Sequence, residues 1–385
     1  MNDTENHIAR TEQVKSSHRI PLRRRLAYVT IIYLLFILLL LGVEVGTRLT
    51  MVHINSLDLF VVTSQQKAQV ADAKQATIFE GDPLLLWRLK PNLDHFVWDF
   101  TVLSTNAQHL RSDRPLQTKQ AGAIRIVCLG DSVTFGYRVP TVWPDKPNVY
   151  DREALPYPML LEKELRAANP NKHIEVITMA VPGYTSHQGL AWLRRDIDQL
   201  KPDLLTISFG WNDASLSEVP DSEAIKTNWR AVAVRWLVDH SQAFAHATRW
   251  LRLKQTPSAR VVRPASRVSE QDYLNNMMAM AELGRQKQAA VIILAAPYRD
   301  QVTNPAEAAL MKRYREGLRS VSSQNGMPFL ELPELTEAAY PANEGWFGEL
   351  IHPNDMGHRL LTLELLKLLG QTRALGNLNI LPLTP

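Results

Sequence analysis

Short apolar segments alternate with longer amphipathic segments between residues 124 and 370, and this alternation restricts the chain to few folds. The first apolar segment, residues 124–129, is rich in β-branched residues, as is typical of a buried parallel strand. Further strands are predicted at 174–178, 203–209, 289–295 and 329–332, with amphipathic helices between them. Repeated strand–helix units with right-handed crossovers predict a three-layer α/β/α sandwich around a parallel sheet of about five strands.

Polar residues and glycine follow the predicted strands at the points where the strands end. Ser132 comes just after the first strand, Gly183 follows the second, and Asn212 follows the third. Because the carboxyl ends of parallel strands lie on one edge of a sheet, we expect these three residues to converge. His352 lies after the fifth strand and just before the last predicted helix, so it can reach the same edge.

These four residue types share a chemical purpose. Serine is a poor nucleophile until a base takes its proton, and His352 can be that base for Ser132. Attack on an acyl group creates an oxyanion, which needs preorganised hydrogen-bond donors. The backbone N–H groups of Ser132 and Gly183 and the side-chain amide of Asn212 could supply three. A glycine at position 183 would also let the oxyanion approach the backbone closely.

Four sequence blocks carry a resemblance to a known family. The blocks are Gly130-Asp131-Ser132-Val133-Thr134-Phe135-Gly136, Ala180-Val181-Pro182-Gly183-Tyr184, Gly210-Trp211-Asn212-Asp213, and Glu349-Leu350-Ile351-His352-Pro353-Asn354 followed by Gly357-His358. In this order, over about residues 122–372, the chain resembles the SGNH hydrolases, also called the GDSL esterase/lipase superfamily. The resemblance implies a flavodoxin-like fold, serine acyl-ester chemistry, and oxyanion roles for Gly183 and Asn212. Residues 26–43 and 82–111 also resemble a membrane-tethered bacterial subgroup.

The last block departs from the family pattern, which usually reads Asp-x-x-His. The acid position here is Glu349, whose side chain is one methylene longer but can still orient His352 through its other ring nitrogen. We favour Glu349 as the third catalytic residue. The alternative is a solvated loop acid beside a Ser132–His352 dyad. In the second block, Thr178 and Ala180 stand where relatives often have asparagine and glycine.

The N-terminal region predicts a membrane anchor. Residues 1–25 are a polar leader ending in three arginines, and residues 26–43 carry no charge. As a helix this run would span about 27 Å, close to the ~30 Å hydrocarbon core of a bilayer. The arginines predict a cytoplasmic N-terminus and an extracytoplasmic, periplasmic remainder of an inner-membrane, single-pass protein. A cleaved signal peptide and a buried core helix are the alternatives, and the length and the arginine flank argue against them.

The rest of the chain divides into further predicted parts. Residues 44–121 form a membrane-proximal segment with a small β-rich piece, 122–372 the main domain, and 373–385 a C-terminal tail. Residues 214–267 interrupt the alternation and predict a helical insertion with three tryptophans among arginines, Trp229, Trp236 and Trp250. We favour a lid whose tryptophans are buried. The alternative is a surface that touches a membrane or a glycan.

Composition excludes several functions. The net charge is +4, and the first 25 residues hold six Lys/Arg against three acids, so the remainder is nearly neutral and untypical of nucleic-acid binders. The single cysteine, Cys128, allows neither an intrachain disulfide nor a cysteine metal cluster. No cofactor or metal is predicted, because the spacing of Asp131, Asp213, His187 and His352 matches no metal motif.

Weaker candidates have structural interpretations that we favour. Asp131 is expected to brace its turn, Asp213 to bond nearby backbone, His187 to lie on the surface and His358 to be structural in the last helix. Asn106 is expected to form a turn, and Arg111 a surface salt bridge, rather than to position the site.

The sequence therefore predicts a membrane-anchored serine esterase acting through an acyl-serine intermediate on an ester, with O-acetyl groups of an envelope glycan among the substrates considered. An O-acetyltransferase that passes the acyl group to an extracytoplasmic polysaccharide is the first alternative. A non-catalytic anchored scaffold is the second.

Overall fold

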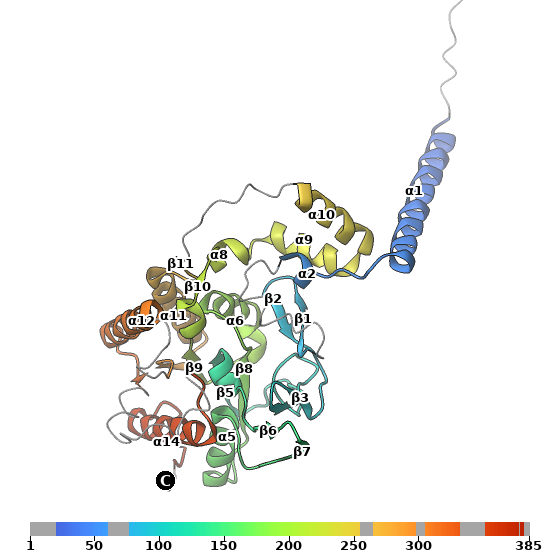
Figure 1. The fold of residues 1–385 in the computed structure, drawn as a ribbon. Helices are drawn as coiled ribbons and strands as arrows, with labels where there is room; N and C mark the ends of the chain where they lie inside the picture. The colour runs from blue at the N-terminus through green and yellow to red at the C-terminus, as the bar shows by residue number, and fades with distance from the viewer. Residues whose placement is uncertain are drawn as a thin grey trace, which may run out of the picture. The chain divides into compact units, whose positions relative to one another are not determined.

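The computed structural model describes residues 21–60, 77–254, 265–297, 305–331, 351–376 and 378–380 (Figure 1). Contacts divide the chain into two compact units. Unit 1 comprises Met1–His53 and Ser241–Ala243, and unit 2 comprises Ile54–His240 and Phe244–Pro385.

Unit 1 is dominated by a single long helix, α1 (Leu22–Thr50), none of whose residues is buried. By length and composition it is the one helix of the described chain that could cross a membrane, a test that signal sequences also pass. Near its end Glu44 pairs with Arg48 at 2.6 Å. The Glu44 carboxylate also accepts hydrogen bonds from the Ser241 hydroxyl (2.8 Å) and from the backbone N–H groups of Gln242 (3.0 Å) and Ala243 (3.1 Å).

Unit 2 is built on the predicted five-stranded parallel sheet. Its strands are β5 (Ile124–Gly130), β8 (Ile174–Ala180), β9 (Leu204–Ser208), β12 (Ala290–Leu294) and β13 (Phe329–Leu330). They lie in the order β13-β12-β9-β5-β8, with every neighbouring pair parallel. This is the flavodoxin-like order, in which the chain reverses direction across the sheet between β5 and β9 and leaves a crevice at the carboxyl ends of those two strands.

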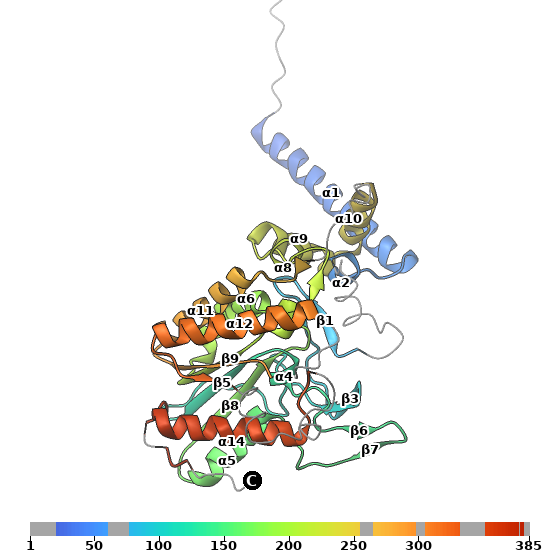
Figure 2. The same cartoon turned by 60° about the vertical axis from the view of Figure 1, so that its left-hand side comes forward.

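Helices cover both faces of the sheet, as predicted (Figure 2). One face carries α6 (Ser186–Leu200), α11 (Glu270–Gln286) and α12 (Pro305–Gln324), and the other carries α5 (Tyr157–Ala168) and α14 (Asp355–Thr372). The period-2 geometry of a strand explains the division: Val127 and Leu129 join the first core, while Ile126 and Cys128 join the second.

The segment before the sheet forms two antiparallel hairpins. They are β1 (Phe79–Asp82) with β2 (Leu86–Leu89), and β3 (Phe96–Trp98) with β4 (Thr101–Leu103). Between β3 and β4 the chain turns at Asp99 and Phe100, both at positive φ. Trp87 is fully buried with its ring 5.6 Å from that of Tyr184, so this β-rich piece packs on the main core.

A third hairpin follows β5 and pairs β6 (Val142–Trp143) with β7 (Lys146–Tyr150). The side chain of Trp143, in β6 of this hairpin, is 63% exposed.

Between β9 and α11 the described residues form short elements and two longer helices. In chain order these are α7 (Trp211–Ala214), β10 (Leu216–Ser217), α8 (Asp221–Ala224), α9 (Trp229–His240), α10 (Gln242–Lys254) and β11 (Ala265–Ser266). The favoured interpretation of buried tryptophans is wrong: Trp229, Trp236 and Trp250 are 74%, 49% and 56% exposed. The inner face of α9 is instead occupied by Val238 and by Arg235, whose guanidinium donates to the carbonyls of Pro83 and Lys226 (both 2.5 Å).

Candidate active site

Ser132 begins a single helical turn, α4 (Ser132–Phe135), directly after β5. Asp131 caps this turn by accepting the N–H of Val133 at 3.0 Å, which agrees with its expected bracing role. Gly130 is required here, because a Cβ atom would lie 2.1 Å from the Thr134 hydroxyl and 2.8 Å from the carbonyl oxygen of Ser208. The turn therefore holds Ser132 at the carboxyl edge of the sheet, at the crevice between β5 and β9.

His352 comes from the C-terminal part of unit 2, far from Ser132 in the sequence. It lies just before α14, whose first turn is capped by the Asn354 side chain accepting the Gly357 N–H at 3.0 Å. The Nε2 atom of His352 lies 2.7 Å from Oγ of Ser132, although the two residues are 220 positions apart. The Tyr137 ring lies 4.5 Å from the imidazole, centroid to centroid, and limits its orientation. The structure thus brings this predicted pair within hydrogen-bond distance.

Asn212 links the loops that follow three neighbouring strands. Its Nδ2 donates to the carbonyl of Tyr184 at 3.0 Å and lies 3.4 Å from Oδ2 of Asp131. Tyr184 directly follows Gly183, which has φ of 85°, a conformation that favours glycine. The loops after β5, β8 and β9 therefore meet at one place, as the strand order requires.

Arg267 is a residue of this region that sequence analysis missed. Its fully buried guanidinium donates to the carbonyl of Gly183 (3.0 Å) and forms two bonds to the Asp221 carboxylate (2.8 and 3.1 Å). Asp221 also accepts the Thr185 hydroxyl at 2.7 Å. This buried ion pair fixes the backbone around Gly183. A lone arginine separated from its partner by 46 positions gives no motif by which it could have been found.

Replacing Arg267 by methionine should lower the free energy of unfolding by about 3–5 kcal/mol, because Asp221 would remain as a buried, unpaired charge. Urea denaturation followed by circular dichroism measures this loss. The matched control is Arg313→Met, which breaks an exposed pair with Glu270 and should cost less than about 1 kcal/mol. An Arg267→Met variant as stable as the control variant would show that the pair does not hold this loop.

Asp213 is fully buried and binds the start of α6. Its carboxyl accepts the N–H of Ser186 at 2.9 Å and the Ser186 hydroxyl, in agreement with the expected backbone contact. Burial raises the pKa of Asp213 to about 8, against hydrogen bonds from Ser186 that act to lower it. In an unfolded chain the pKa of an aspartate is ~3.9, so between about pH 4 and pH 8 the folded state binds more protons.

The free energy of unfolding should therefore fall as the pH rises from about 4 to about 8 through the contribution of Asp213. Asp213→Asn, which keeps the shape of the neutral acid, should match the parent protein near pH 5 and exceed its stability near pH 8. Urea denaturation at a series of pH values measures both curves. Parallel curves would contradict the assignment of this pH dependence to Asp213.

Arg111 corrects another expectation, because it is no surface salt bridge. Its side chain is buried, and its guanidinium donates to the carbonyls of Phe135, Gly136, Val102 (3.1 Å) and Val139 (2.6 Å). Two of these carbonyls end the α4 turn that begins with Ser132. Arg111 therefore holds the end of the α4 turn in place. This is the positioning role that the sequence made the less favoured of two interpretations.

The remaining candidates have structural contacts or lie outside the described chain. The Nε2 atom of His187 lies 2.9 Å from the carbonyl of Ile225, and the Nδ1 atom of the buried His358 accepts the Tyr157 N–H at 3.2 Å. Asn106 forms the expected turn by accepting the N–H groups of Gln108 and Leu110. Glu349 lies outside the described residues. Among the residues that are described, no group of three or more His, Cys, Asp or Glu side chains could hold a metal ion.

A cavity of about 320 Å³ adjoins His352. Its walls come from the β3–β4 turn, the segment after α4, the β6–β7 hairpin and the segment before α14. They include Phe100, Tyr137, Arg138, Trp143 and Pro353. The guanidinium of Arg138 lies over both the Tyr137 ring (5.0 Å) and the Phe100 ring (5.6 Å). The cavity is therefore an aromatic-walled recess that opens beside the Ser132–His352 pair.

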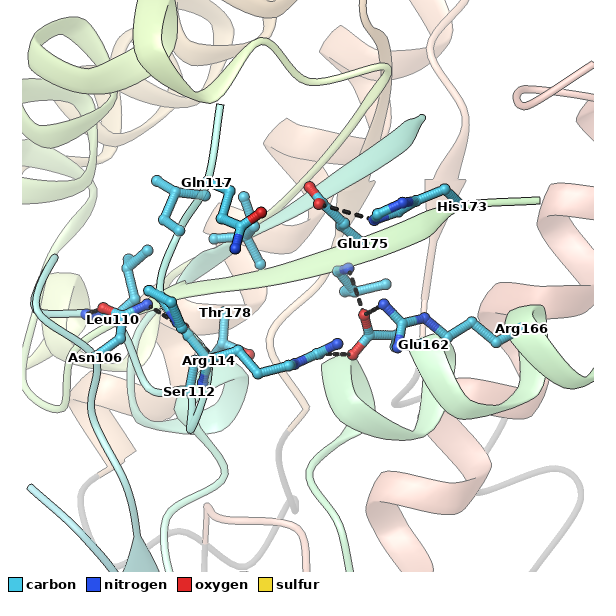
Figure 3. Close-up of a pocket in the computed structure, with 14 residues that line it drawn as sticks. Asn106, Leu110, Ser112, Arg114, Gln117, Glu162, Arg166, His173, Glu175 and Thr178 are labelled. Atoms are coloured by element: carbon cyan, nitrogen blue, oxygen red, sulfur yellow. Dashed lines mark hydrogen bonds and ion pairs between the residues drawn. The ribbon is translucent and has the colours of Figure 1, made fainter. Parts of the chain in front are cut away.

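A second cavity of about 320 Å³ lies along β8 and contains none of the predicted site residues (Figure 3). Its carboxylates are paired: Glu162 with Arg114 and with Arg166 (2.8 Å), and Glu175 with Arg125 (2.7 Å). The Glu162–Arg114 pair ties α5 to the segment before β5, and Arg166 of α5 donates to the carbonyl of Ile174 in β8 at 2.7 Å. The cavity is a structural ion-pair network and not part of the candidate site.

A model of the GDSL-like lipase/acylhydrolase family matches residues 128–360. No curated protein matches the chain. Among solved structures, a lipase/acylhydrolase of Enterococcus faecalis is 21% identical, with 68% of this chain and 100% of that chain covered and a TM-score of 0.42. An α/β hydrolase from the metagenome of Lake Arreo, Spain, is 18% identical over 64% and 96%, with a TM-score of 0.43. A variant of an acetyl-xylooligosaccharide esterase of Geobacillus stearothermophilus is 17% identical over 65% and 95%, with a TM-score of 0.41.

Proposed function

Because the chain belongs to the GDSL-like lipase/acylhydrolase family and is a serine ester hydrolase, we propose that Ser132 and His352 are its nucleophile and its general base. The observation that carries this proposal is the 2.7 Å distance between Ser132 Oγ and His352 Nε2. Hydrogen-bond contact between a hydroxyl and an imidazole at the carboxyl edge of a parallel sheet is the arrangement that activated serines need.

The proposed reaction has two stages. Nε2 of His352 takes the hydroxyl proton while Ser132 Oγ attacks the ester carbonyl, and the same nitrogen then returns the proton to the departing alcohol. The backbone N–H groups of Ser132 and Gly183 and the Asn212 amide hold the oxyanion in each stage. Water, deprotonated by His352, then attacks the acyl-serine, releases the carboxylic acid and restores the hydroxyl. Glu349 remains the proposed third member that orients the imidazole, with a dyad as its alternative.

We propose an O-acetylated sugar of an envelope glycan as the substrate. The recess beside His352 supports this class, because aromatic side chains present flat apolar faces with polar tips, which suit the faces of sugar rings. Its volume of about 320 Å³ lies at the lower end of the range for small-ligand sites, so it fits one or two sugar units better than a long acyl chain.

The proposed location is the outer side of the cytoplasmic membrane, with α1 as a single-pass anchor. Three arginines, Arg23, Arg24 and Arg25, precede the uncharged part of α1, which supports a cytoplasmic N-terminus. Unit 2 would then act in the periplasm.

The substrate proposal predicts that Trp143→Ala raises KM for an O-acetylated oligosaccharide about 3- to 10-fold, because one aromatic contact with the sugar is lost. The KM for p-nitrophenyl acetate should not change. Trp229→Ala, another exposed tryptophan outside the recess, is the control. Equal effects of Trp143→Ala on both substrates would contradict the proposed sugar contact. Mass spectrometry of the same reactions distinguishes free acetate, which the hydrolase produces, from acetyl groups moved to a second sugar, the product of an acetyltransferase.

A further inference from the structure

The helices α9 and α10 present an outer face of large apolar side chains. We define this outer face by Trp229, Trp236, Leu237, Trp250 and Leu251, each between 38% and 74% exposed. On α9 the exposed positions 229, 230, 233, 234, 236, 237 and 240 recur at intervals of three and four, so they lie on one side of the helix. Several large apolar side chains exposed on two consecutive helices are typical of a contact with a partner or a membrane.

The charge around the outer face is positive. Arg230 and Arg249 are exposed beside the tryptophans, and the Arg230 guanidinium lies 5.4 Å from the Trp229 ring centroid. The guanidinium of Arg252 instead donates to the carbonyl of Leu59 and lies over the Phe60 ring. The only acid in the two helices is Asp239, which faces inward and accepts the N–H (2.7 Å) and hydroxyl (2.9 Å) of Ser56. Tryptophan and arginine together, with no acid on the same face, are typical of helices that lie in an anionic bilayer interface.

Chain connectivity keeps these helices close to the end of α1. Ile54 is 97% buried, in a cluster with Val238 of α9 and Ala245 of α10. Only four residue steps separate Ile54 from Thr50, the last residue of α1, and a fully extended chain of that length spans at most about 14 Å. Ile54, which packs against both helices, can therefore lie no further than this from the last residue of α1.

We propose that the outer face of α9 and α10 is a second membrane contact, which binds the anionic phospholipid surface of the bilayer that α1 spans. The tryptophans would lie at the boundary of headgroups and acyl chains, and the arginines would pair with lipid phosphates. Attachment through both α1 and the outer face would restrict the rotation of unit 2 relative to the membrane. Attachment through α1 alone would not. This inference rests on the anchoring part of the proposed function and is independent of its catalytic part.

Site-specific labelling of the full-length protein tests this contact. Cys128 is the only cysteine and is buried, so Cys128→Ala gives a background for single labels. Ala233→Cys and Ala247→Cys place an environment-sensitive fluorophore on the exposed sides of α9 and α10, and Ser320→Cys places it on the exposed side of α12 as a control. Each protein is reconstituted in vesicles of phosphatidylcholine with or without phosphatidylglycerol.

We expect the labels at 233 and 247 to shift to shorter emission wavelengths and to be quenched by spin-labelled lipids in the anionic vesicles, while the label at 320 is unaffected. Raising the salt concentration from 0.1 M to 1 M should weaken the quenching, because the Debye length falls from ~10 Å to ~3 Å. Replacing Trp229, Trp236 and Trp250 by serine should abolish the quenching and leave p-nitrophenyl acetate hydrolysis in detergent unchanged.

Three results would overturn the inference. Labels at 233 and 247 that are quenched no more than the label at 320 would show that the face does not touch lipid. Equal quenching in neutral vesicles would remove the role of anionic lipid, and spectral changes that follow protein density without lipid quenching would identify a second copy of the chain as the occupant. Flotation of the same proteins with the vesicles reports the α1 anchor separately, so its failure is distinguishable from failure of the second contact.

Discussion

Ser132→Ala should lower kcat for p-nitrophenyl acetate by about 10⁴-fold or more, to the rate that binding and the oxyanion donors alone can support. The substitution removes the single atom that would form the acyl bond, and with it the 2.7 Å contact to His352. The α4 turn should persist, because it depends on the backbone carbonyl of Ser132, which accepts the N–H groups of Gly136 and Tyr137 (both 3.0 Å).

The control for this experiment is Ser320→Ala, a serine on the exposed side of α12 far from the site in the sequence, which should retain full activity. Steady-state kinetics of both variants, with circular dichroism to verify folding, makes the comparison. A folded Ser132→Ala variant with the parent rate would refute the nucleophile assignment.

Asn212→Ala should lower kcat by about 10²–10³-fold with little change in KM, the effect of removing one oxyanion donor. The amide already lies where the three loops meet, held at 3.0 Å by the Tyr184 carbonyl. Its contact with Asp131 is long at 3.4 Å, so the second amide hydrogen can turn to the oxyanion at small energetic cost.

Loss of the hydrogen bond to Tyr184 should cost only about 0.5–1.5 kcal/mol of folding free energy, so unfolding would not explain such a fall in kcat. Asn325→Ala, which removes a comparable side-chain bond to the carbonyl of Val321, is the matched control and should leave kcat unchanged. A rise in KM with normal kcat in Asn212→Ala would assign the amide to substrate binding instead.

The sheet could be predicted because its strands are buried on both sides. Each strand reads as a short apolar run between turn residues, and alternate positions such as Val127 and Cys128 then pack into the two cores. The convergence of Ser132, Asn212 and His352 follows from the same topology, since parallel strands place their following loops on one edge. The contact between Ser132 and His352 could therefore be predicted, although 220 positions separate the two residues in the sequence.

The supporting residues could not be predicted, because their partners are backbone groups or distant charges. Arg111 and Arg235 donate to carbonyls, which every residue carries, so their burial leaves no trace in the sequence pattern. Arg267 depends on Asp221 from another part of the insertion. The exposure of the tryptophans of α9 and α10 could not be predicted either. An amphipathic helix has an apolar stripe whether that stripe packs on a core or lies at the surface.

Labelling with a fluorophosphonate tests the central claim, the activation of Ser132 by His352, most directly. These probes phosphonylate a serine hydroxyl whose proton is taken by a neighbouring base. We expect one adduct per chain, which peptide mass spectrometry places on Ser132 and which His352→Ala prevents. A folded, hydrolytically active protein that carries no adduct, or carries it on a different residue, would contradict the account.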